Sequence, residues 1–435
     1  MPEEVRPGIQ DSKGPHGGAF AGWGPMRLVA DERAPAAISS VYVHAPFCAR
    51  RCHYCGFSVT VAPRPDLEGW LAALAAELDL VAAEGRFPLS PALATVFVGG
   101  GTPSLLGPGA MEGLVGVLGP ERFRDAGFEW TAEANPESFT AELARGWSAA
   151  GVNRVSLGAQ SFHPGALRWM GRLHGPSEIG VAVERARAEG LMNINLDLIF
   201  GLPEMVERDW ESDLDHALAL EVPHLSLYGL ASEEGTPLAG AVREGRVTLA
   251  SEEAYGAEFL QASRRLQAGG YRHYEVSNFA LPGFEARHNL VYWTLEPYLG
   301  LGNSAHSFLH PFRRWNLRAW GAYQKVVLAG RPPWESEEKL GTREVALERI
   351  WLGLRTAAGI HLDDLGSSAR ELVEEWALEG YARLEKDAVI LTPRGWLLLD
   401  HLAVVLDSAV EQDRGCGEPG RPWRVGGASA AEPTG

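Results

Sequence analysis

The chain has 435 residues, of which 46% are hydrophobic and 22% charged, values typical of a globular protein with two or three domains. Its formal net charge of −17 argues against sequence-independent binding of nucleic acid, which depends on basic patches. No uncharged apolar run is long enough to cross a membrane, and the N-terminus has no basic segment followed by an apolar core. We therefore expect a cytoplasmic protein without a transmembrane segment.

The two ends of the chain differ in composition from its middle. Residues 1–38 and 409–435 are rich in small residues and proline, which offer little apolar surface to bury, and we expect both segments to be disordered. Cys416 lies alone in the second of them and reads as an incidental thiol. The residues between divide into a first domain, 39–330, and a smaller helical domain, 331–408.

Short apolar strands alternate with amphipathic helices in the first domain. The predicted strands are residues 41–45, 95–99, 128–133, 155–159, 194–200 and 224–228. The clearest helix covers 66–81, with Asp66 as its N-cap. Near-continuous apolar strands alternating with helices indicate a parallel sheet with right-handed crossovers. Six such units fall short of a closed barrel, so the predicted fold class is α/β, a partial (β/α)6 TIM-like barrel with ligands at the C-terminal strand ends.

The second domain shows a different pattern. Helical periodicity over 342–358 and 370–379 is followed by a predicted hairpin at 382–391 and a last helix over 393–406. This order predicts a small winged-helix-like domain. The segment 370–379 is net acidic, which argues against a DNA-binding role.

Three cysteines follow the first strand directly. Cys48, Cys52 and Cys55 have the spacing C-x3-C-x2-C. Three thiolates from one loop can hold three irons of a [4Fe–4S] cluster, which leaves the fourth iron open to the amino and carboxylate groups of S-adenosylmethionine. A structural zinc site would need a fourth ligand, for which only His53 is near, and a disulfide would leave one thiol over.

The segment from Tyr42 to Cys55, Tyr-Val-His-Ala-Pro-Phe-Cys followed by Cys-His-Tyr-Cys, resembles the radical S-adenosylmethionine superfamily. More narrowly, residues 40–405 resemble the branch of oxygen-independent coproporphyrinogen III oxidases. The resemblance implies a [4Fe–4S] cluster and bound S-adenosylmethionine.

Glycines and polar residues mark the ends of the predicted strands. Gly99-Gly100-Gly101-Thr102 follows the second strand, and glycines allow a backbone to approach a ligand closely. Glu133, Gln160 and Asp197 lie at or near the ends of later strands, where carboxylates can hold ribose hydroxyls. Each could also cap a strand or bond within the sheet. The resemblance implies that S-adenosylmethionine is bound by Tyr42, Tyr54, Gly100, Gly101, Thr102, Glu133, Gln160, Arg172, Asp197 and Ala231.

Two features separate the chain from the oxidases of this branch. Those enzymes continue past the third cysteine as Cys-Gly-Cys, whereas here Phe57 replaces the last thiol. The hexapeptide from His288 to Trp293 fits H-N-x-x-Y-W, a pattern of the related haem chaperones of the HemW type. The resemblance implies haem as a third ligand and haem-acceptor proteins as partners.

We take His288 as the candidate axial haem ligand, with Tyr292 and Trp293 packing on the macrocycle. The alternative is that all three pack in the core, and His306 is a weaker candidate ligand. The function that we predict is a haem chaperone. The alternatives are an oxidative decarboxylase of coproporphyrinogen III and a radical methyltransferase or cyclase that acts on another substrate.

Overall fold

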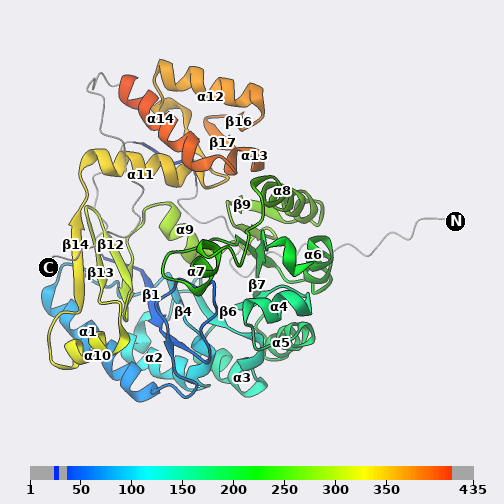
Figure 1. Ribbon diagram of the computed structural model, residues 1–435. Helices are drawn as coiled ribbons and strands as arrows, with labels where there is room; N and C mark the ends of the chain where they lie inside the picture. Colours follow the sequence, from blue (N-terminus) through cyan, green and yellow to red (C-terminus); the bar gives the residue numbers. More distant parts are fainter. Residues whose placement is uncertain (1–23, 29–36, 414–435) are drawn as a thin grey trace, which may run out of the picture.

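The computed structural model describes residues 24–28 and 37–413. Six parallel strands form the centre of its largest sheet, in the order β1, β4, β5, β6, β7, β8 (Figure 1). Their bounds are β1 (Ser40–Ala45), β4 (Thr95–Gly100), β5 (Glu129–Ala134), β6 (Arg154–Gln160), β7 (Asn193–Phe200) and β8 (His224–Gly229). Each strand end lies within one residue of its predicted position. The prediction of a six-stranded partial barrel is confirmed.

Additional strands pair with both edges of the six-stranded sheet, and the two edges do not pair with each other. The short β11 (Leu299–Leu301) pairs in parallel with β1. At the other edge β10 (Asn278–Ala280) runs antiparallel to β8, and β9 (Arg272–Glu275) pairs with β10. Neither edge meets the other, so the barrel is not closed.

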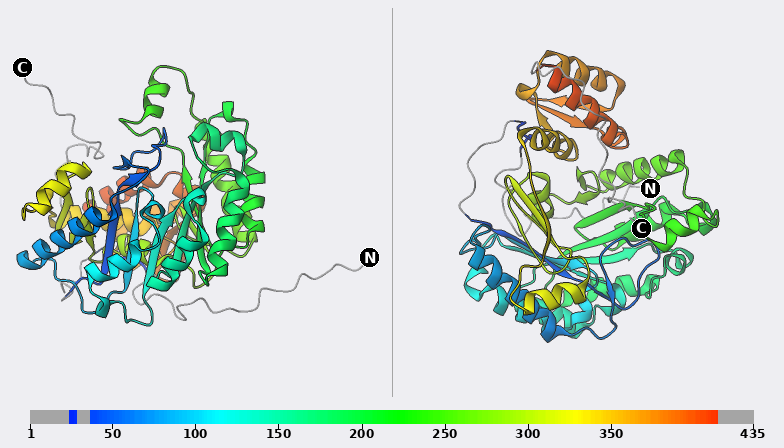
Figure 2. Two further views of the ribbon diagram at one scale, coloured as in Figure 1. Left: turned by 90° about the horizontal axis from the view of Figure 1, so that it is seen from below. Right: turned by 60° about the vertical axis from the view of Figure 1, so that its left-hand side comes forward.

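Helices cover the outer side of the curved sheet, as Figure 2 shows. They are α1 (Leu67–Glu84), α2 (Ala110–Leu118), α3 (Ala141–Ala150), α4 (Pro164–Met170), α5 (Pro176–Ala188), α6 (Trp210–Ala219) and α8 (Glu252–Ala268). The N-cap predicted at Asp66 is confirmed, since its carboxylate accepts a hydrogen bond from the Gly69 amide. Such a cap satisfies an amide that has no partner within the helix.

A segment between the sheet and the C-terminal region was not anticipated in any detail. It contains α7 (Pro237–Arg243), α9 (Arg287–Trp293), α10 (Trp320–Leu328) and a three-stranded antiparallel sheet of β12 (His306–Leu309), β13 (Phe312–Asn316) and β14 (Trp334–Lys339). The strand β14 is acidic and mostly exposed. It therefore lacks the hydrophobic alternation by which half-buried strands are recognised.

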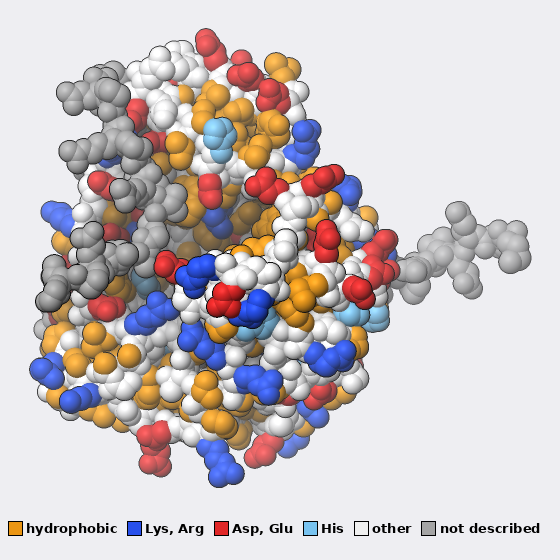
Figure 3. Space-filling view, viewed as in Figure 1, with side chains coloured by type: hydrophobic (Ala, Val, Ile, Leu, Met, Phe, Trp, Pro, Cys, Tyr) orange, Lys and Arg blue, Asp and Glu red, His pale blue; other side chains and the backbone are white. Residues whose placement is uncertain are grey.

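A C-terminal lobe of residues 342–413 lies beside the sheet (Figure 1). It consists of α11 (Thr342–Leu354), β15 (Ile360–His361), α12 (Ser367–Glu379), β16 (Ala382–Glu385), β17 (Ala388–Leu391), α13 (Pro393–Trp396) and α14 (Leu399–Asp413). The predicted hairpin is β16–β17, and its turn contains Lys386 at positive φ. Figure 3 shows the molecular surface hollowed beneath this lobe, with hydrophobic side chains in the hollow.

The expected disorder at the two ends is wrong where the structure describes them. Met26 pairs with Ile360, and the buried Leu28 donates its amide to Asp364, so residues 24–28 are held by the C-terminal lobe. At the other end, α14 extends to Asp413, whose carboxylate accepts amide hydrogen bonds at the start of α12. Contacts with residues distant in the sequence hold residues 24–28 and 409–413, and composition does not reveal such contacts. The rest of the predicted disorder, and Cys416, lie outside the described residues.

Candidate functional site

Cys48 ends a very short strand, and Cys52 and Cys55 lie on the loop that joins it to a second one. β2 (Phe47–Cys48) pairs in parallel with β3 (Thr60–Val61), which closes the loop at the C-terminal end of β1. The Cys48 thiol accepts a hydrogen bond from the Thr102 hydroxyl at 3.4 Å, and Arg172 lies with Nη1 3.8 Å from the Cys52 sulfur. All three cysteines line one cavity of about 420 Å³.

The cavity joins most of the residues that the sequence assigned to S-adenosylmethionine. Besides the cysteines, its walls include Tyr54, Gly100, Gly101, Thr102, Glu133, Gln160, Arg172, Asp197 and Ala231. Tyr42 does not line it. Its hydroxyl lies 2.9 Å from Nδ1 of His44, inside β1. Nine of the ten predicted residues thus meet at the C-terminal strand ends, where parallel α/β folds bind ligands.

The three thiols can be compared with the ligand sets of two kinds of metal site. Within residues 24–28 and 37–413, no three His, Cys, Asp or Glu side chains converge closely enough to hold a single metal ion. A tetrahedral zinc site requires such convergence, whereas each thiolate of a cubane cluster binds a different iron. Three thiols beside an open cavity supply the donors of a cluster that keeps one iron for a further ligand.

Burial disfavours the thiolate form of Cys48 and Cys55 when no metal is bound. Burial raises the pKa of Cys48 to about 11, although the Thr102 hydrogen bond acts in the opposite direction. Burial also raises the pKa of Cys55. A metal that binds the sulfur releases these protons, because metal ligation and thiol ionisation are linked.

Two carboxylates lie on the wall opposite the cysteine loop. Glu133 accepts a hydrogen bond from the Gly100 amide at 3.0 Å, and Asp197 accepts one from the Asn195 side-chain amide at 2.7 Å. Burial, together with the charge of Asp197, raises the pKa of Glu133 to about 8. Within the described chain neither carboxylate has an ion-pair partner, and two half-buried acids so placed favour a ligand that brings hydroxyl donors or positive charge.

Arg172 crosses the cavity between the strand ends and the cysteines. Its Nη2 donates to the Asn135 side-chain oxygen at 2.6 Å and to the Gly158 carbonyl at 2.9 Å, and its Nε is buried without a partner among the described residues. Among the described residues, no acidic side chain forms an ion pair with Arg172. The guanidinium therefore keeps bonding capacity for a ligand carboxylate.

Gly100 and Gly101 are needed for close packing between neighbouring backbone segments, besides facing the cavity. Gly100 has φ +104°, and a Cβ there would lie 2.3 Å from the His44 ring. A Cβ on Gly101 would lie 2.6 Å from the Ala45 carbonyl oxygen. Both glycines thus allow β4 to pass close to β1, which brings the Gly100 and Gly101 backbone to the cavity wall.

The strand β6 ends in an irregular turn that shapes the cavity. Its pairing with β7 shifts register between Leu157 and Gln160, and Gln160 has φ +68°, a conformation that costs energy for a residue with a side chain. Bulges of this kind redirect side chains next to functional sites. Here Gln160 becomes part of the cavity wall.

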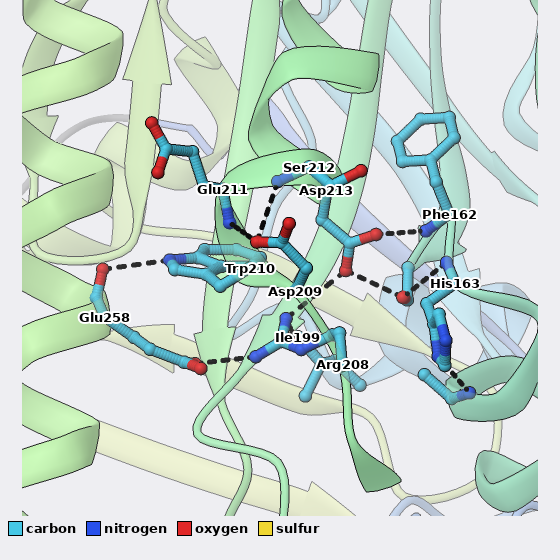
Figure 4. Close-up of polar contacts among 12 residues, drawn as sticks. Phe162, His163, Ile199, Arg208, Asp209, Trp210, Glu211, Ser212, Asp213 and Glu258 are labelled. Atoms are coloured by element: carbon cyan, nitrogen blue, oxygen red, sulfur yellow. Dashed lines mark hydrogen bonds and ion pairs between the residues drawn. The ribbon is translucent and has the colours of Figure 1, made fainter.

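A buried ion network connects the segment that follows β6 with the segment that follows β7 (Figure 4). Arg208 lies 3.3 Å from Asp213 and 2.6 Å from Glu258, and it donates to the Ile199 carbonyl. The side chains of Arg208 and Asp213 are each only 2% exposed. Because Ile199 lines the cavity, the network fixes one of its walls.

The same carboxylate holds the chain just beyond Gln160. Asp213 accepts hydrogen bonds from the Ser161 hydroxyl and the Phe162 amide, both at 2.7 Å (Figure 4). The sequence analysis missed this network, and also Asn135 and Tyr228 of the cavity wall. Asn135 could have been predicted from the sequence, because it follows Glu133 by two positions at the same strand end. The pairing of Arg208 with Asp213 is a tertiary feature with no local pattern.

His288, the candidate axial haem ligand, lies in the core of the structure. The side chain is fully buried, and its ring nitrogens lie 2.8 Å from the Thr95 hydroxyl and 2.8 Å from the Tyr292 hydroxyl. Burial lowers the pKa of His288 to about 3. Both ring nitrogens thus have hydrogen-bond partners in the core, and the assignment of His288 to haem stays a prediction.

The other aromatic candidates separate from one another. Trp293 packs beside Tyr274 and Leu290, and the guanidinium of Arg355 lies 4.9 Å from its ring. Tyr292 lines a second cavity, apart from the cysteines. His306 is exposed and stacks on Trp315.

Comparisons with known proteins agree with this geometry. Residues 42–217 match the family model of the radical SAM superfamily. The haem chaperone HemW of Mycobacterium tuberculosis is 37% identical over 381 residues, which cover 86% of this chain and 96% of the relative. HemW of Bacillus subtilis is 33% identical, over 83% and 97% of the two chains.

Among solved structures, the fold is similar to coproporphyrinogen III oxidase (HemN) from Escherichia coli. The TM-score is 0.69 at 23% identity, covering 87% of this chain and 92% of the oxidase. No helix among the described residues is long and apolar enough to span a membrane. The radical SAM match implies a [4Fe–4S] cluster and S-adenosylmethionine, for which the cavity has the donors described above.

Proposed function

Because the chain belongs to the HemW family of radical SAM proteins, we propose that it is a haem chaperone, which binds haem and transfers it to acceptor proteins. The observation that carries this proposal is the 37% identity to a haem chaperone over 96% of that relative's length. The resemblance to the oxidase, at 23% identity, concerns the fold alone.

The proposal assigns the first cavity to the cluster and S-adenosylmethionine. Cys48, Cys52 and Cys55 would each hold one iron. When bound, the cluster would supply an electron to S-adenosylmethionine. Glu133 and Asp197 would accept hydrogen bonds from the ribose hydroxyls of that cofactor, which offsets the cost of burying two acids.

The rim of the cavity supports a carrier over the oxidase. Phe57, which replaces the thiol of the oxidases, is 68% exposed on the cysteine loop. It can supply neither a proton nor a metal ligand there. The proposal includes a cytoplasmic location, because a cluster of free thiols requires a reducing compartment.

Haem transfer is the experiment that tests the proposal. The protein with reconstituted cluster is loaded with one equivalent of hemin, separated from free hemin and mixed with an apo-haemoprotein of distinct Soret maximum. We expect the Soret band to move to the acceptor faster than from a hemin–albumin control. Anaerobic formation of protoporphyrinogen IX from coproporphyrinogen III, without haem transfer, would contradict the proposal and favour the oxidase.

A further inference from the structure

The cysteine loop ends in a segment that is anchored on two sides. Ser58 lies three residues after Cys55 and two before β3. Its carbonyl oxygen accepts a hydrogen bond from Nε2 of His44 on β1, at 2.9 Å. Its hydroxyl donates to the Arg318 carbonyl oxygen at 2.6 Å. Ser58 therefore connects the cysteine loop both to β1 and to the segment between β13 and α10, which lies 260 positions later in the chain.

Asn303 contributes a buried amide to the same contact. The residue lies between β11 and β12 and is only 1% exposed. Its side-chain nitrogen donates to the Arg318 carbonyl oxygen at 2.9 Å and to the Ser58 hydroxyl at 3.3 Å. A buried amide is costly unless it is hydrogen-bonded, so these bonds favour one arrangement of the three residues. We call Ser58, Asn303 and Arg318 the loop anchor.

The turn that carries Asn303 is held by a buried acid. Glu77 of α1 accepts hydrogen bonds from the Gly302 amide at 2.7 Å and from the Tyr323 hydroxyl at 2.5 Å. Gly302 has φ +98°, and a Cβ there would lie 2.8 Å from the His44 carbonyl oxygen, so this turn passes close to β1. Asn303 therefore belongs to a backbone segment that is fixed against both α1 and β1.

Arg318 also reaches the loop with its side chain. Nη2 donates to the Gly56 carbonyl oxygen at 3.0 Å. The side chain is exposed, so water can replace this hydrogen bond when it is lost. The hydrogen bonds of the buried Asn303 amide have no such replacement. We therefore expect Asn303 to contribute more to the loop anchor than the Arg318 guanidinium does.

The loop anchor is the contact nearest to Cys55 on its C-terminal side. At the start of the loop, Cys48 is held by the pairing of β2 with β3. In the middle, the His53 carbonyl oxygen accepts a hydrogen bond from the Leu238 amide at 2.9 Å. Cys55 lies between this contact and the loop anchor. Because a cluster needs its three thiolates at the same time, release of the anchor would loosen one iron ligand.

We propose that Asn303 is a positioning residue for the iron–sulfur cluster, which acts through Ser58 to fix the part of the loop that carries Cys55. Neither Asn303 nor Ser58 lines the first cavity, so both act through the loop backbone and not by contact with a ligand. The inference rests on the proposed assignment of the first cavity to the cluster. It does not depend on haem transfer.

Two measurements on the full chain test this role. Hydrogen–deuterium exchange of the apo-protein reports the opening of residues 56–62, where the Thr60 and Ala62 amides close the loop on the backbone of residues 46 and 48. The rate at which a ferrous chelator removes iron from the anaerobically reconstituted protein reports how firmly the cluster is held. The variants are Asn303→Ala, Ser58→Ala and Ser58→Thr, the last of which keeps the hydroxyl.

The matched controls separate positioning from general stability. Asn153 makes two hydrogen bonds, to the Phe128 carbonyl oxygen at 2.7 Å and from the Trp130 amide at 2.8 Å, at the start of β6 and so at the end of the sheet away from the cavity. Asn153→Ala therefore removes a comparable amide. Ser232→Ala removes an exposed hydroxyl next to the cavity wall. Urea denaturation of each apo-protein measures the overall loss of stability.

We expect Asn303→Ala and Ser58→Ala to release iron about fivefold faster than the wild type, the change that one lost hydrogen bond produces in an opening equilibrium. Residues 56–62 should exchange faster in both variants. Ser58→Thr should restore both rates. Asn153→Ala should lower the urea midpoint without changing either rate, and Ser232→Ala should behave as the wild type does.

The contrary results are distinct. Wild-type iron release and loop exchange in Asn303→Ala would overturn the proposal, and so would an equal acceleration in Asn153→Ala. If Asn303→Ala does not fold, the two Ser58 variants decide, and equal rates for alanine and threonine would refute the anchor. A wild-type protein that takes up no iron would overturn the cluster assignment as well, whereas the haem-transfer assay tests the chaperone function separately.

Discussion

The buried ion network beneath the first cavity allows a quantitative prediction. Replacing Asp213 by alanine removes an acceptor from the Phe162 amide and one carboxylate from Arg208. A buried donor without a partner costs about 1–3 kcal/mol, and breaking a buried ion pair costs about 3–5 kcal/mol. Glu258 still neutralises Arg208, so we expect a loss near the lower end, about 3 kcal/mol of unfolding free energy.

Urea denaturation of the apo-protein measures this loss, and hydrogen–deuterium exchange locates it. The amide of Phe162 should exchange faster in Asp213→Ala, because its acceptor is gone. S-adenosylmethionine binding to the reconstituted protein should weaken as well, since the same network fixes the turn after Gln160. Asp213→Asn keeps one acceptor oxygen and should fall between wild type and alanine.

The matched control is Asp215→Ala on the same helix. Asp215 forms an ion pair with Arg265, but both side chains are about half exposed, so water replaces the lost partner. We expect little change in the denaturation midpoint for this variant. If Asp213→Ala is no less stable than Asp215→Ala, the reasoning from burial and hydrogen bonding is refuted.

Three further predictions concern the first cavity. Cys52→Ala should lose iron–sulfur absorbance and S-adenosylmethionine binding but keep hemin binding, and unchanged iron content would contradict the cluster assignment. The pKa of Glu133 is raised from 4.5 to about 8 in the folded protein, so the unfolding free energy should fall as the pH rises between these values. Glu133→Gln should make the urea denaturation midpoint depend less on pH over this range. The same pH dependence in variant and wild type would exclude Glu133 as its cause. Gly100→Ala should destabilise the protein more than Gly107→Ala, which also has positive φ but open space around it, and equal losses would show that the His44 contact has no role.

The sequence predicted those elements that depend only on residues close to one another in the chain. The six apolar strands, the Asp66 cap and the cysteine loop are each readable within about ten residues, and the parallel topology then places Glu133, Gln160 and Asp197 at one edge. The features that were missed depend on pairing across the fold. Arg208 meets Glu258 only because α8 packs beside α6.

The haem assignment rests on a sequence motif, which does not describe tertiary contacts. The hexapeptide suggested a ligand at His288, but the motif does not reveal that Thr95 and Tyr292 already engage both ring nitrogens in the core. The β12–β14 sheet was missed because the acidic, exposed β14 lacks the hydrophobic alternation of a half-buried strand. Order at residues 24–28 was missed because their partners lie more than 300 positions away.

The most direct test of the central claim is an anaerobic hemin titration of the full chain with its cluster reconstituted, followed by Soret absorbance and by gel filtration of the complex. The account predicts saturation at one hemin per chain, with the same stoichiometry in Cys52→Ala. A linear increase without saturation, or binding that disappears together with the cluster, would contradict a haem site separate from the cysteines.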